Sequence, residues 1–259
     1  MTKVYSYCIL FCMLCLSMAT AGSAHAQTAV TLYIQENLDV NGSPIPPDQN
    51  LMELINYFER TTNLQFNKMI VPWRRAQYET LQGNGIIYGL SRNPDRLSRF
   101  HYSQAVASQT IWAITYGKPK PKYKTIEDLR GKVISVGRGF SHGMEFEQAR
   151  DIIFKVEEDA SFTTARFNKL INKTNDLILW PLRVLKDQSE VETYINQVFA
   201  NYSGFKDTHF DVSDQPLFYD TEHFASAKGK FEDIIAKIDK AIVEGKKSGE
   251  LSKLLRAYR

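Results

Sequence analysis

A glycine-rich turn, GRGFSHG at residues 137–143, carries the first residues whose types and spacing suggest chemistry. It follows a short β-rich run at 133–136, and a segment with helical character begins near Gly143 or Met144. Backbone N–H groups at the start of a helix attract anions, and the Ser141 hydroxyl would add a donor. The last gap is one residue longer than in the dinucleotide fingerprint G-x-G-x-x-G, so no nucleotide site is predicted. An ordinary strand-to-helix turn fits the pattern equally well, and both interpretations stay open.

A second candidate for anion binding is Arg96, in the segment SRNPDR at residues 91–96. The segment follows a predicted strand at 86–88, and ligand pockets of α/β proteins form beyond the carboxyl ends of strands. A guanidinium group can hold a carboxylate through two parallel hydrogen bonds, which lysine cannot do. A surface arginine paired with Asp95 or with solvent is the alternative, because arginine is mostly an exposed residue.

The chain shows no arrangement of residues typical of a catalytic or metal site. The histidines after residue 26 are scattered without the spacing of metal ligands, and neither a G-x-S-x-G elbow nor a Walker loop is present. Trp73 and Trp180 each adjoin a proline beside a predicted strand, so each could be a pocket wall or part of the core. We therefore predict no catalytic residue, no metal and no cofactor, and the net charge of +3 does not favour a nucleic-acid partner.

The first 26 residues have the three parts of a cleavable signal peptide. Lys3 supplies the positive start, residues 9–18 form a short apolar run, and Ala24 and Ala26 are the small residues that signal peptidase reads. A transmembrane anchor is the alternative, but the run is well short of the roughly 20 apolar residues that span a bilayer. All three cysteines lie in this segment, so we expect a periplasmic mature protein without disulfides or thiol chemistry.

The rest of the chain alternates short apolar strands with amphipathic helices, which predicts an α/β architecture with a largely parallel sheet. The predicted strands are residues 30–34, 64–70, 86–88, 133–136 and 177–180. The predicted helices are residues 48–60, 72–81, 125–131 from a capping box at Thr125, one from 143 or 144, one over 191–199, and a tail beyond 231. Two βα blocks result, joined near 115–124, where alternating lysines and prolines predict an extended linker.

Several motifs, taken in order, resemble the amino-acid-type family of bacterial extracellular solute-binding proteins, which serve ABC transporters. The stretch GIIYGLSRNPDR at 85–96, followed by FHYS at 100–103, is similar to the family's strand, Ser or Thr, T-P-E-R-like turn and F-S-x-P. The segment TIEDLRG at 125–131, with the next strand and the glycine-rich turn, is similar to a second family signature. The segment GELSKL at 249–254 is similar to a carboxyl-terminal G-x-L-x-K-L. The resemblance spans essentially all of residues 27–259.

This resemblance implies a two-lobed periplasmic binding protein fold of type II, with two hinge crossings. Lobe one would comprise residues 27–114 and 215–259, and lobe two residues 115–214. The lobes would close on a ligand that lies between them, as hinged domains do in general.

The resemblance also assigns ligand contacts to particular residues. Arg96 falls on the family's arginine for the ligand carboxylate. Ser91 falls on a hydroxyl contact and Gly89 on a backbone contact of the same loop. Ser141 falls where a Thr or Ser at a helix N-terminus meets that carboxylate from the other lobe. Both candidate anion contacts would thus converge on one anion.

Three aromatic residues, Phe140, Trp73 and Trp180, are expected to line the pocket, and two of them mark departures from the family. Phe140 replaces a small Thr or Ser beside Ser141. Trp180 and Pro181 stand where amino-acid binders carry the acid that holds the ligand's α-amino group. The ligand could therefore be a carboxylate without an amino group, an aromatic compound or another solute.

These observations favour a periplasmic solute-binding protein that captures a small carboxylate-bearing metabolite, amino-acid-like or another organic acid. Besides the ligand, its partner would be an ABC importer permease or a membrane sensor, and we expect a monomer that is not an enzyme. One alternative is an enzyme of the same fold that resembles cyclohexadienyl dehydratases, with Glu36 or Asp176 as the acid that protonates a leaving hydroxyl. The other is a sensory binding module that takes no part in transport.

Overall fold

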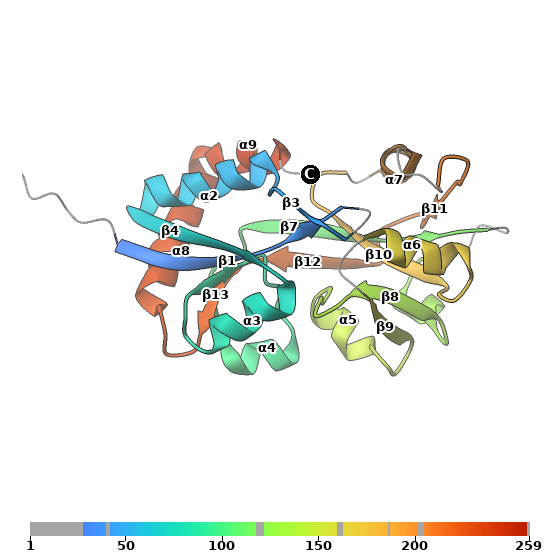
Figure 1. Cartoon of the computed structure of the whole chain (residues 1–259), viewed down its shortest axis with the longest axis horizontal. Coiled ribbons are helices and arrows are strands. Elements are labelled where there is room, and N and C mark those ends of the chain that lie inside the picture. Colours follow the sequence, from blue (N-terminus) through green and yellow to red (C-terminus); the bar gives the residue numbers. More distant parts are fainter. Residues whose placement is uncertain are drawn as a thin grey trace, which may run out of the picture.

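The structure is a computed structural model, and it describes residues 28–39, 42–117, 122–159, 163–185, 187–200 and 205–257. The expected signal peptide lies outside these ranges, as do residues 118–121 of the expected linker. The described residues form two α/β lobes, with lobe one on the left of Figure 1 and lobe two on the right. None of the helices within these ranges combines the length and the apolar character needed to cross a bilayer.

Lobe one is built on a five-stranded sheet with helices on both faces (Figure 1). Its strands, in spatial order, are β4 (Leu64–Val71), β1 (Thr28–Gln35), β5 (Ile86–Tyr88), β13 (Phe224–Ala227) and β6 (Phe100–Tyr102). One face carries α2 (Gln49–Thr62), α8 (Glu232–Ser248) and α9 (Glu250–Ala257), and the other carries α3 (Trp73–Leu81) and α4 (Pro94–Arg99). A ribbon of β2 (Asn37–Leu38) and β3 (Pro44–Ile45) follows β1.

Successive side chains of β1 point to opposite faces of the sheet, so β1 contributes to an apolar core on each face. Leu32 and Ile34 belong to the apolar cluster beneath α2 and α8. Tyr33, between them, packs instead with Trp73 and Ala76 of α3. The helix that begins at Trp73 is thereby fixed against the sheet.

A side-chain cap fixes the start of α2, where the sequence predicted it. The Asp48 carboxylate accepts hydrogen bonds from the N–H groups of Asn50 at 2.8 Å and Leu51 at 3.2 Å, which would otherwise lack partners. Asn63, in the left-handed conformation with φ 55°, ends the helix. The predicted helix over 48–60 is confirmed, and it extends by two residues beyond the predicted end.

Lobe two is built on a second sheet, with strand order β11-β7-β10-β8-β9 and β12 paired to β7. Its strands are β7 (Ala107–Thr115), β8 (Val133–Gly137), β9 (Lys155–Asp159), β10 (Leu177–Leu182), β11 (Asp211–Val212) and β12 (Phe218–Glu222). Its helices are η1 (Ile126–Leu129), α5 (Met144–Ala149), α6 (Thr163–Ile171) and α7 (Gln188–Ala200). Two apolar clusters, one containing Phe146 and Phe218 and the other Phe167 and Phe199, form its core.

Both sheets are mixed, so the prediction of a largely parallel sheet is wrong. The strands at 30–34, 86–88 and 133–136 do pair in parallel with neighbours, as expected of βα units. β7 is antiparallel to β10, β11 and β12, and β13 is antiparallel to β5 and β6. These antiparallel pairs come from strands that lead the chain into lobe two and back.

The two crossings between the lobes lie side by side. The chain passes from β6 to β7 through residues 103–106 and returns from β12 to β13 through His223. Ser103 N–H donates to the Phe224 oxygen at 2.9 Å, and Val106 N–H donates to the Glu222 oxygen at 2.8 Å. The chain therefore passes from one sheet to the other at residues 103–106 and 223, which are several residues away from 114 and 215. The lobe limits at 114 and 215 stay a prediction. The two-lobed α/β fold with two crossings is confirmed.

Candidate ligand-binding site

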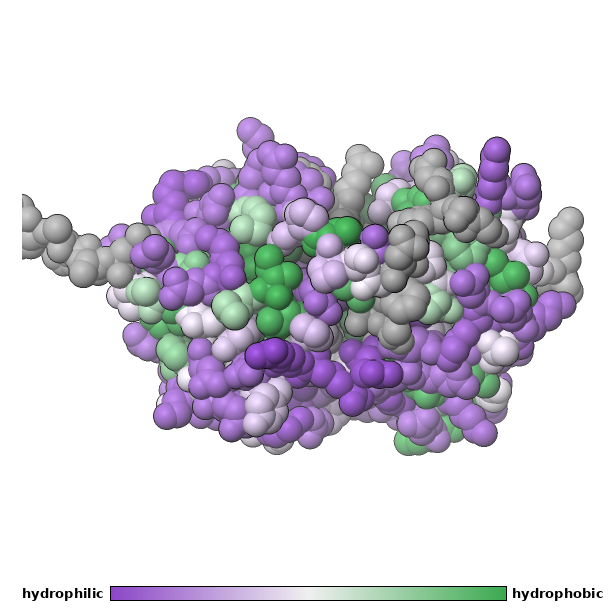
Figure 2. Space-filling model, viewed as in Figure 1, coloured by the Kyte–Doolittle hydropathy of each residue, from purple (hydrophilic) through white to green (hydrophobic). Residues whose placement is uncertain are grey.

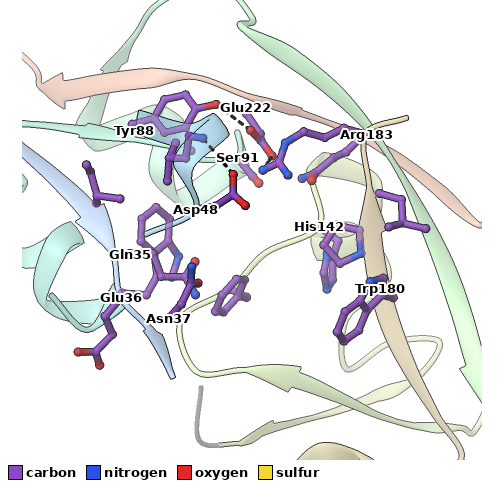
Figure 3. A pocket seen from close by; sticks show the side chains of 18 of the residues that line it. Gln35, Glu36, Asn37, Asp48, Tyr88, Ser91, His142, Trp180, Arg183 and Glu222 are labelled. Carbon is purple, nitrogen blue, oxygen red and sulfur yellow. Dashed lines mark hydrogen bonds and ion pairs between the residues drawn. The ribbon is translucent and has the colours of Figure 1, made fainter. Parts of the chain in front are cut away.

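A cavity of about 550 Å³ lies between the two lobes, and side chains from both lobes line it. Its volume is within the range of small-molecule sites in proteins. Figure 3 shows Gln35, Glu36 and Asn37 of lobe one on one side, facing His142 and Trp180 of lobe two on the other. Figure 2 shows hydrophobic side chains gathered near the junction of the lobes, on a face that is otherwise mostly hydrophilic.

Each residue that the sequence singled out for binding lines this cavity. These residues are Trp73, Gly89, Ser91, Arg96, Phe140, Ser141 and Trp180. They come from segments more than 100 residues apart in the chain, so the fold brings together what the sequence predicted separately. Their contact with a ligand stays a prediction.

Arg96 is held in place from several directions. Asn93 caps α4 by accepting a hydrogen bond from Arg96 N–H at 2.7 Å, and this sets the direction of the helix. The guanidinium donates to the Ser91 oxygen at 3.1 Å and to the Gly139 oxygen at 2.8 Å. Its exposed fraction is 5%, and Asp95 pairs with Arg99 instead. The interpretation of Arg96 as a surface arginine is therefore wrong.

Burial lowers the pKa of Arg96, and the nearby hydroxyl of Tyr102 and carboxylates such as Glu147 and Asp220 oppose that effect. The group stays a cation at neutral pH, because an arginine side chain does not lose its proton in proteins. A desolvated cation on the wall of a cavity attracts an anion more strongly than an exposed one does.

Ser91 is engaged by an acid that the sequence analysis missed. Its hydroxyl donates to the Asp220 carboxylate at 2.5 Å and lies 3.3 Å from the Ser141 oxygen. Asp220 also accepts from Thr221 N–H at 2.7 Å. Burial raises the pKa of Asp220, and these hydrogen bonds oppose the rise. Asp220 belongs to β12, which was not predicted as a strand, so nothing in the sequence analysis placed it beside Ser91.

The glycine-rich turn presents two polar side chains that lack partners. Ser141 Oγ and His142 Nε2 are buried without a hydrogen-bond partner among the described residues. Burial, together with the positive charges of Arg166 and Arg96, lowers the pKa of His142 to about 3, so its imidazole is neutral at neutral pH. Buried polar groups are nearly always hydrogen-bonded, so two orphans on one cavity wall point to a missing partner.

Aromatic rings form much of the remaining wall. The Trp73 ring packs on Phe140 with centroids 6.2 Å apart, across the junction of the lobes. Trp180 is half-buried and packs edge-to-face against Phe167 at 5.8 Å. Trp73 thus serves both the core and the cavity wall, while Trp180 contributes to the cavity from the margin of a core cluster.

No protein-family profile and no curated protein sequence matches the chain. Solved structures match it over most of its length. A mutant of ArgBP from T. maritima shares 17% identity at a TM-score of 0.64, over 90% of this chain and 95% of that one. AbpA, an amino acid ABC transporter substrate-binding protein from Streptococcus pneumoniae bound to L-arginine, shares 15% at 0.64, over 90% and 94%. The GluR0 ligand-binding core in complex with L-glutamate shares 13% at 0.66, over 90% and 98%.

The chain has the fold of type II periplasmic binding proteins. In this type II fold the two lobes touch on the side of α3 and α4. Gln77 Nε2 donates to the Gly139 oxygen at 3.0 Å, and Arg74 forms an ion pair with Glu158 at 2.5 Å. Together with the Arg96 hydrogen bond, these contacts hold the lobes together beside the cavity.

The type II fold also places a buried ionic network at the cavity wall, which sequence reasoning missed. Glu222 of β12 pairs with Arg183 at 2.5 Å, and Tyr88 Oη donates to Glu222 at 3.1 Å (Figure 3). Asp220 and Glu222 lie two residues apart on β12, so both side chains are on the same face of the strand. A correct strand prediction for 218–222 would have placed the two acids together. Arg183 balances the charge of Glu222, which is therefore not a free anion for a ligand.

The two acids of the enzyme hypothesis are placed very differently. Glu36 lines the cavity and is partly exposed. Asp176 is exposed, accepts a hydrogen bond from Val133 N–H at 2.8 Å, and does not line the cavity. The suggestion of Asp176 as the pocket acid is therefore wrong.

One cluster among the described residues could hold a metal ion, although the sequence predicted no metal site. The ligand atoms of Glu192, His209 and Asp211 lie within 4.8 Å of one another, at the junction of α7 and β11. Glu192 already pairs with His209 at 3.3 Å and accepts from Gln188 at 2.6 Å. None of these three residues lines the cavity.

Proposed function

We propose that this chain is a periplasmic solute-binding protein that captures a small carboxylate-bearing metabolite between its lobes. The observation that carries the proposal is a buried arginine, Arg96, on the wall of a cavity that both lobes line. Solved proteins of the same fold, including AbpA with L-arginine and the GluR0 core with L-glutamate, carry amino acids as ligands. The expected signal peptide at residues 1–26 would deliver the protein to the periplasm.

Arg96 has donor capacity left for a carboxylate. A guanidinium carries five N–H donors, and the hydrogen bonds to Ser91, Gln77 and Gly139 use three of them. The unpartnered Ser141 hydroxyl, from lobe two, would complete the site. One ligand carboxylate would then bond to both lobes and stabilise the arrangement in which they touch.

Other lining residues determine which group the ligand can carry at the end away from Arg96. No acid stands at Trp180 or Pro181, and Glu222 is already balanced by Arg183. A ligand that carries an amino group would find no unbalanced buried acid among the described lining residues. An organic acid without an amino group fits this wall as well as an amino acid does.

A binding protein of this kind would act as a monomer and hand its ligand to an ABC importer permease or to a membrane sensor. Neither a nucleic acid nor a cofactor is part of the proposal. Catalysis is not part of it either, because the sequence shows no motif typical of a catalytic site.

A thermal-shift screen of small carboxylates, with calorimetry on each hit, tests the proposal. Binding to the folded state alone raises the melting temperature, by an amount that grows with the ratio of the free ligand concentration to Kd. R96M should weaken a hit by about 2–5 kcal/mol, the usual loss when one partner of a buried charge pair is truncated. R99M removes an exposed arginine from the same helix and should leave the affinity unchanged. A screen without any hit, or a hit that R96M binds as tightly as the wild type, would refute the proposal.

A further inference from the structure

A second arginine, Arg166 of α6, lines the cavity from lobe two. Its exposed fraction is 9%, and its Nε has no hydrogen-bond partner among the described residues. Its guanidinium carbon lies 5.9 Å from the centroid of the Trp180 ring, a cation–π contact that holds the side chain against the aromatic wall. An arginine buried in this way, with an unsatisfied donor at a cavity, is costly without an anion to bind.

His142 lies on the same cavity wall and also has a buried nitrogen without a hydrogen-bond partner among the described residues. Its exposed fraction is 3%, and its Nε2 lacks a partner among the described residues. The ring packs edge-to-face on Phe146 at 5.2 Å, which fixes its plane. Arg166 is close enough to help lower the pKa of His142 to about 3, after the larger effect of burial. The neutral imidazole can carry its proton on Nε2 and donate it to an acceptor in the cavity.

No acid of the described residues completes this pair. Asp159 is the acid whose charge acts on Arg166, but its carboxylate is already bonded to Lys169 and Ser135. Glu222 pairs with Arg183. The other lining acids belong to lobe one, where Glu36 is partly exposed and Asp48 is exposed, so water screens them. Arg166 therefore brings a positive charge to the cavity that no lining acid is bonded to.

We infer that Arg166 and His142 form a second anion subsite, so that the ligand carries two acidic groups, one at Arg96 and one at this wall. The inference rests on the proposed function and narrows its ligand class to a dicarboxylate or a carboxylate with a phosphate-type group. The stem that joins the two acids would pass beside Trp180, which favours an apolar or planar stem.

Calorimetry with matched probes tests the second subsite. The probes are linear α,ω-dicarboxylates of four to eight carbons, their ω-monoamides, and ω-phosphonocarboxylates of the same lengths. A monoamide keeps the size and the first carboxylate but loses the second charge. The wild-type protein should bind the best diacid at least tenfold more tightly than its monoamide, and the dicarboxylate and phosphono arms identify the acid that the subsite prefers.

R166M should abolish this preference, with a loss of at least tenfold for the diacid and little change for the monoamide. R138M removes an exposed arginine from the same lobe, outside the cavity lining, and should keep the preference. H142Q offers a second variant if R166M does not fold, and it should reduce the same preference.

Two failures are distinguishable. If diacids and monoamides bind the wild type equally and Arg96 is still required, the second subsite is refuted while the proposed function stands. If no carboxylate binds at all, both fail together.

Discussion

Nη2 of Arg96 in lobe one donates a hydrogen bond of 2.8 Å to the backbone oxygen of Gly139 in lobe two. The residue proposed to hold the ligand carboxylate is therefore also a contact between the lobes. A ligand bound to Arg96 would be sensitive to how closely the glycine-rich turn approaches α3 and α4. Binding and lobe closure would share this one side chain, which couples them energetically.

Replacing Gly139 by alanine should weaken ligand binding through this contact. Gly139 has φ +77°, and an added Cβ would lie 2.8 Å from Cγ of Arg74, which is too close. The positive φ strains an alanine in any arrangement of the lobes and lowers stability by about 1–3 kcal/mol, whereas the clash with Arg74 arises only where the lobes touch. Because the clash is with the other lobe, we expect a roughly tenfold loss of affinity by calorimetry. Small-angle scattering should show a larger population of separated lobes.

Gly131→Ala is the matched control for this change. Gly131 also has a positive φ, +73°, and belongs to lobe two, but an added Cβ would meet nothing within 4 Å. It should lower the free energy of unfolding and leave the affinity as it is. Equal affinity losses in both variants would contradict the idea that closure depends on Gly139.

Asp220→Asn should tighten the binding of a carboxylate. Asp220 is near enough to Arg96 to affect its pKa, and it takes the hydroxyl hydrogen of Ser91. Removing its charge lessens the repulsion of an incoming anion by about 1 kcal/mol, for charges ~8 Å apart at an effective dielectric constant of ~40. Calorimetry at neutral pH should show a roughly fivefold gain. Asp214→Asn, at an exposed position, should show none.

The pH dependence provides a separate check on Asp220. Burial raises its pKa, so its carboxyl group gains a proton at a higher pH than an exposed aspartate does. The affinity of the wild type should therefore approach that of D220N as the pH falls. An affinity gap that stays constant down to the pH at which the ligand itself is protonated would contradict this account.

The sequence predicted the βα units well because each has a strong local signal. The strand at 86–88 agrees at both ends, and the short helix after Thr125 forms with the capping box that was predicted, although as a 3₁₀ turn. Periodicity and caps depend only on neighbouring residues, so they can be recognised without the fold. The α/β class followed from the order of these elements, whereas the two-lobed arrangement followed from the resemblance to solute-binding proteins.

The parts that the sequence did not predict depend on long-range pairing. Strands β7 and β12 pair residues such as Ala107 and Glu222, which are far apart in sequence, and neither strand was predicted. As a result Asp220 and Glu222 were missed. Arg166 was missed because α6 was not predicted, and its burial follows from packing against Trp180. A lone arginine or histidine has no sequence signal that distinguishes a cavity wall from the surface.

His223, at the return crossing between the lobes, should make the folded state less stable in acid. Burial lowers its pKa to about 4, from an ordinary value of 6.5. Between pH 6.5 and 4 the unfolded chain binds a proton that the folded chain does not, so the free energy of unfolding falls as the pH falls. His142, with a pKa of about 3, acts in the same direction.

Proton NMR of the His223 ring tests this expectation directly. The ring should titrate near pH 4 in the folded protein and near 6.5 in denaturant, where burial is lost. Ser103 O at 2.8 Å from Nδ1 and Thr221 Oγ1 at 2.8 Å from Nε2 fit a neutral ring with its proton on Nδ1. A folded-state titration near 6.5 would contradict both the pKa and the predicted acid sensitivity.

Breaking the ion pair between Arg183 and Glu222 should lower the free energy of unfolding strongly only when one partner is removed and the other keeps its charge. The side chain of Glu222 is 4% exposed, so Arg183→Met leaves a buried, unbalanced carboxylate, which costs about 3–5 kcal/mol. Adding Glu222→Gln removes the charge and keeps an acceptor for Tyr88, so the double variant should recover much of that loss. Urea unfolding measures each free energy of unfolding. Arg130→Met, from an exposed pair with Glu127, should change it by less than about 1 kcal/mol. A double variant that is less stable than R183M alone would show that the pair contributes more than charge balance.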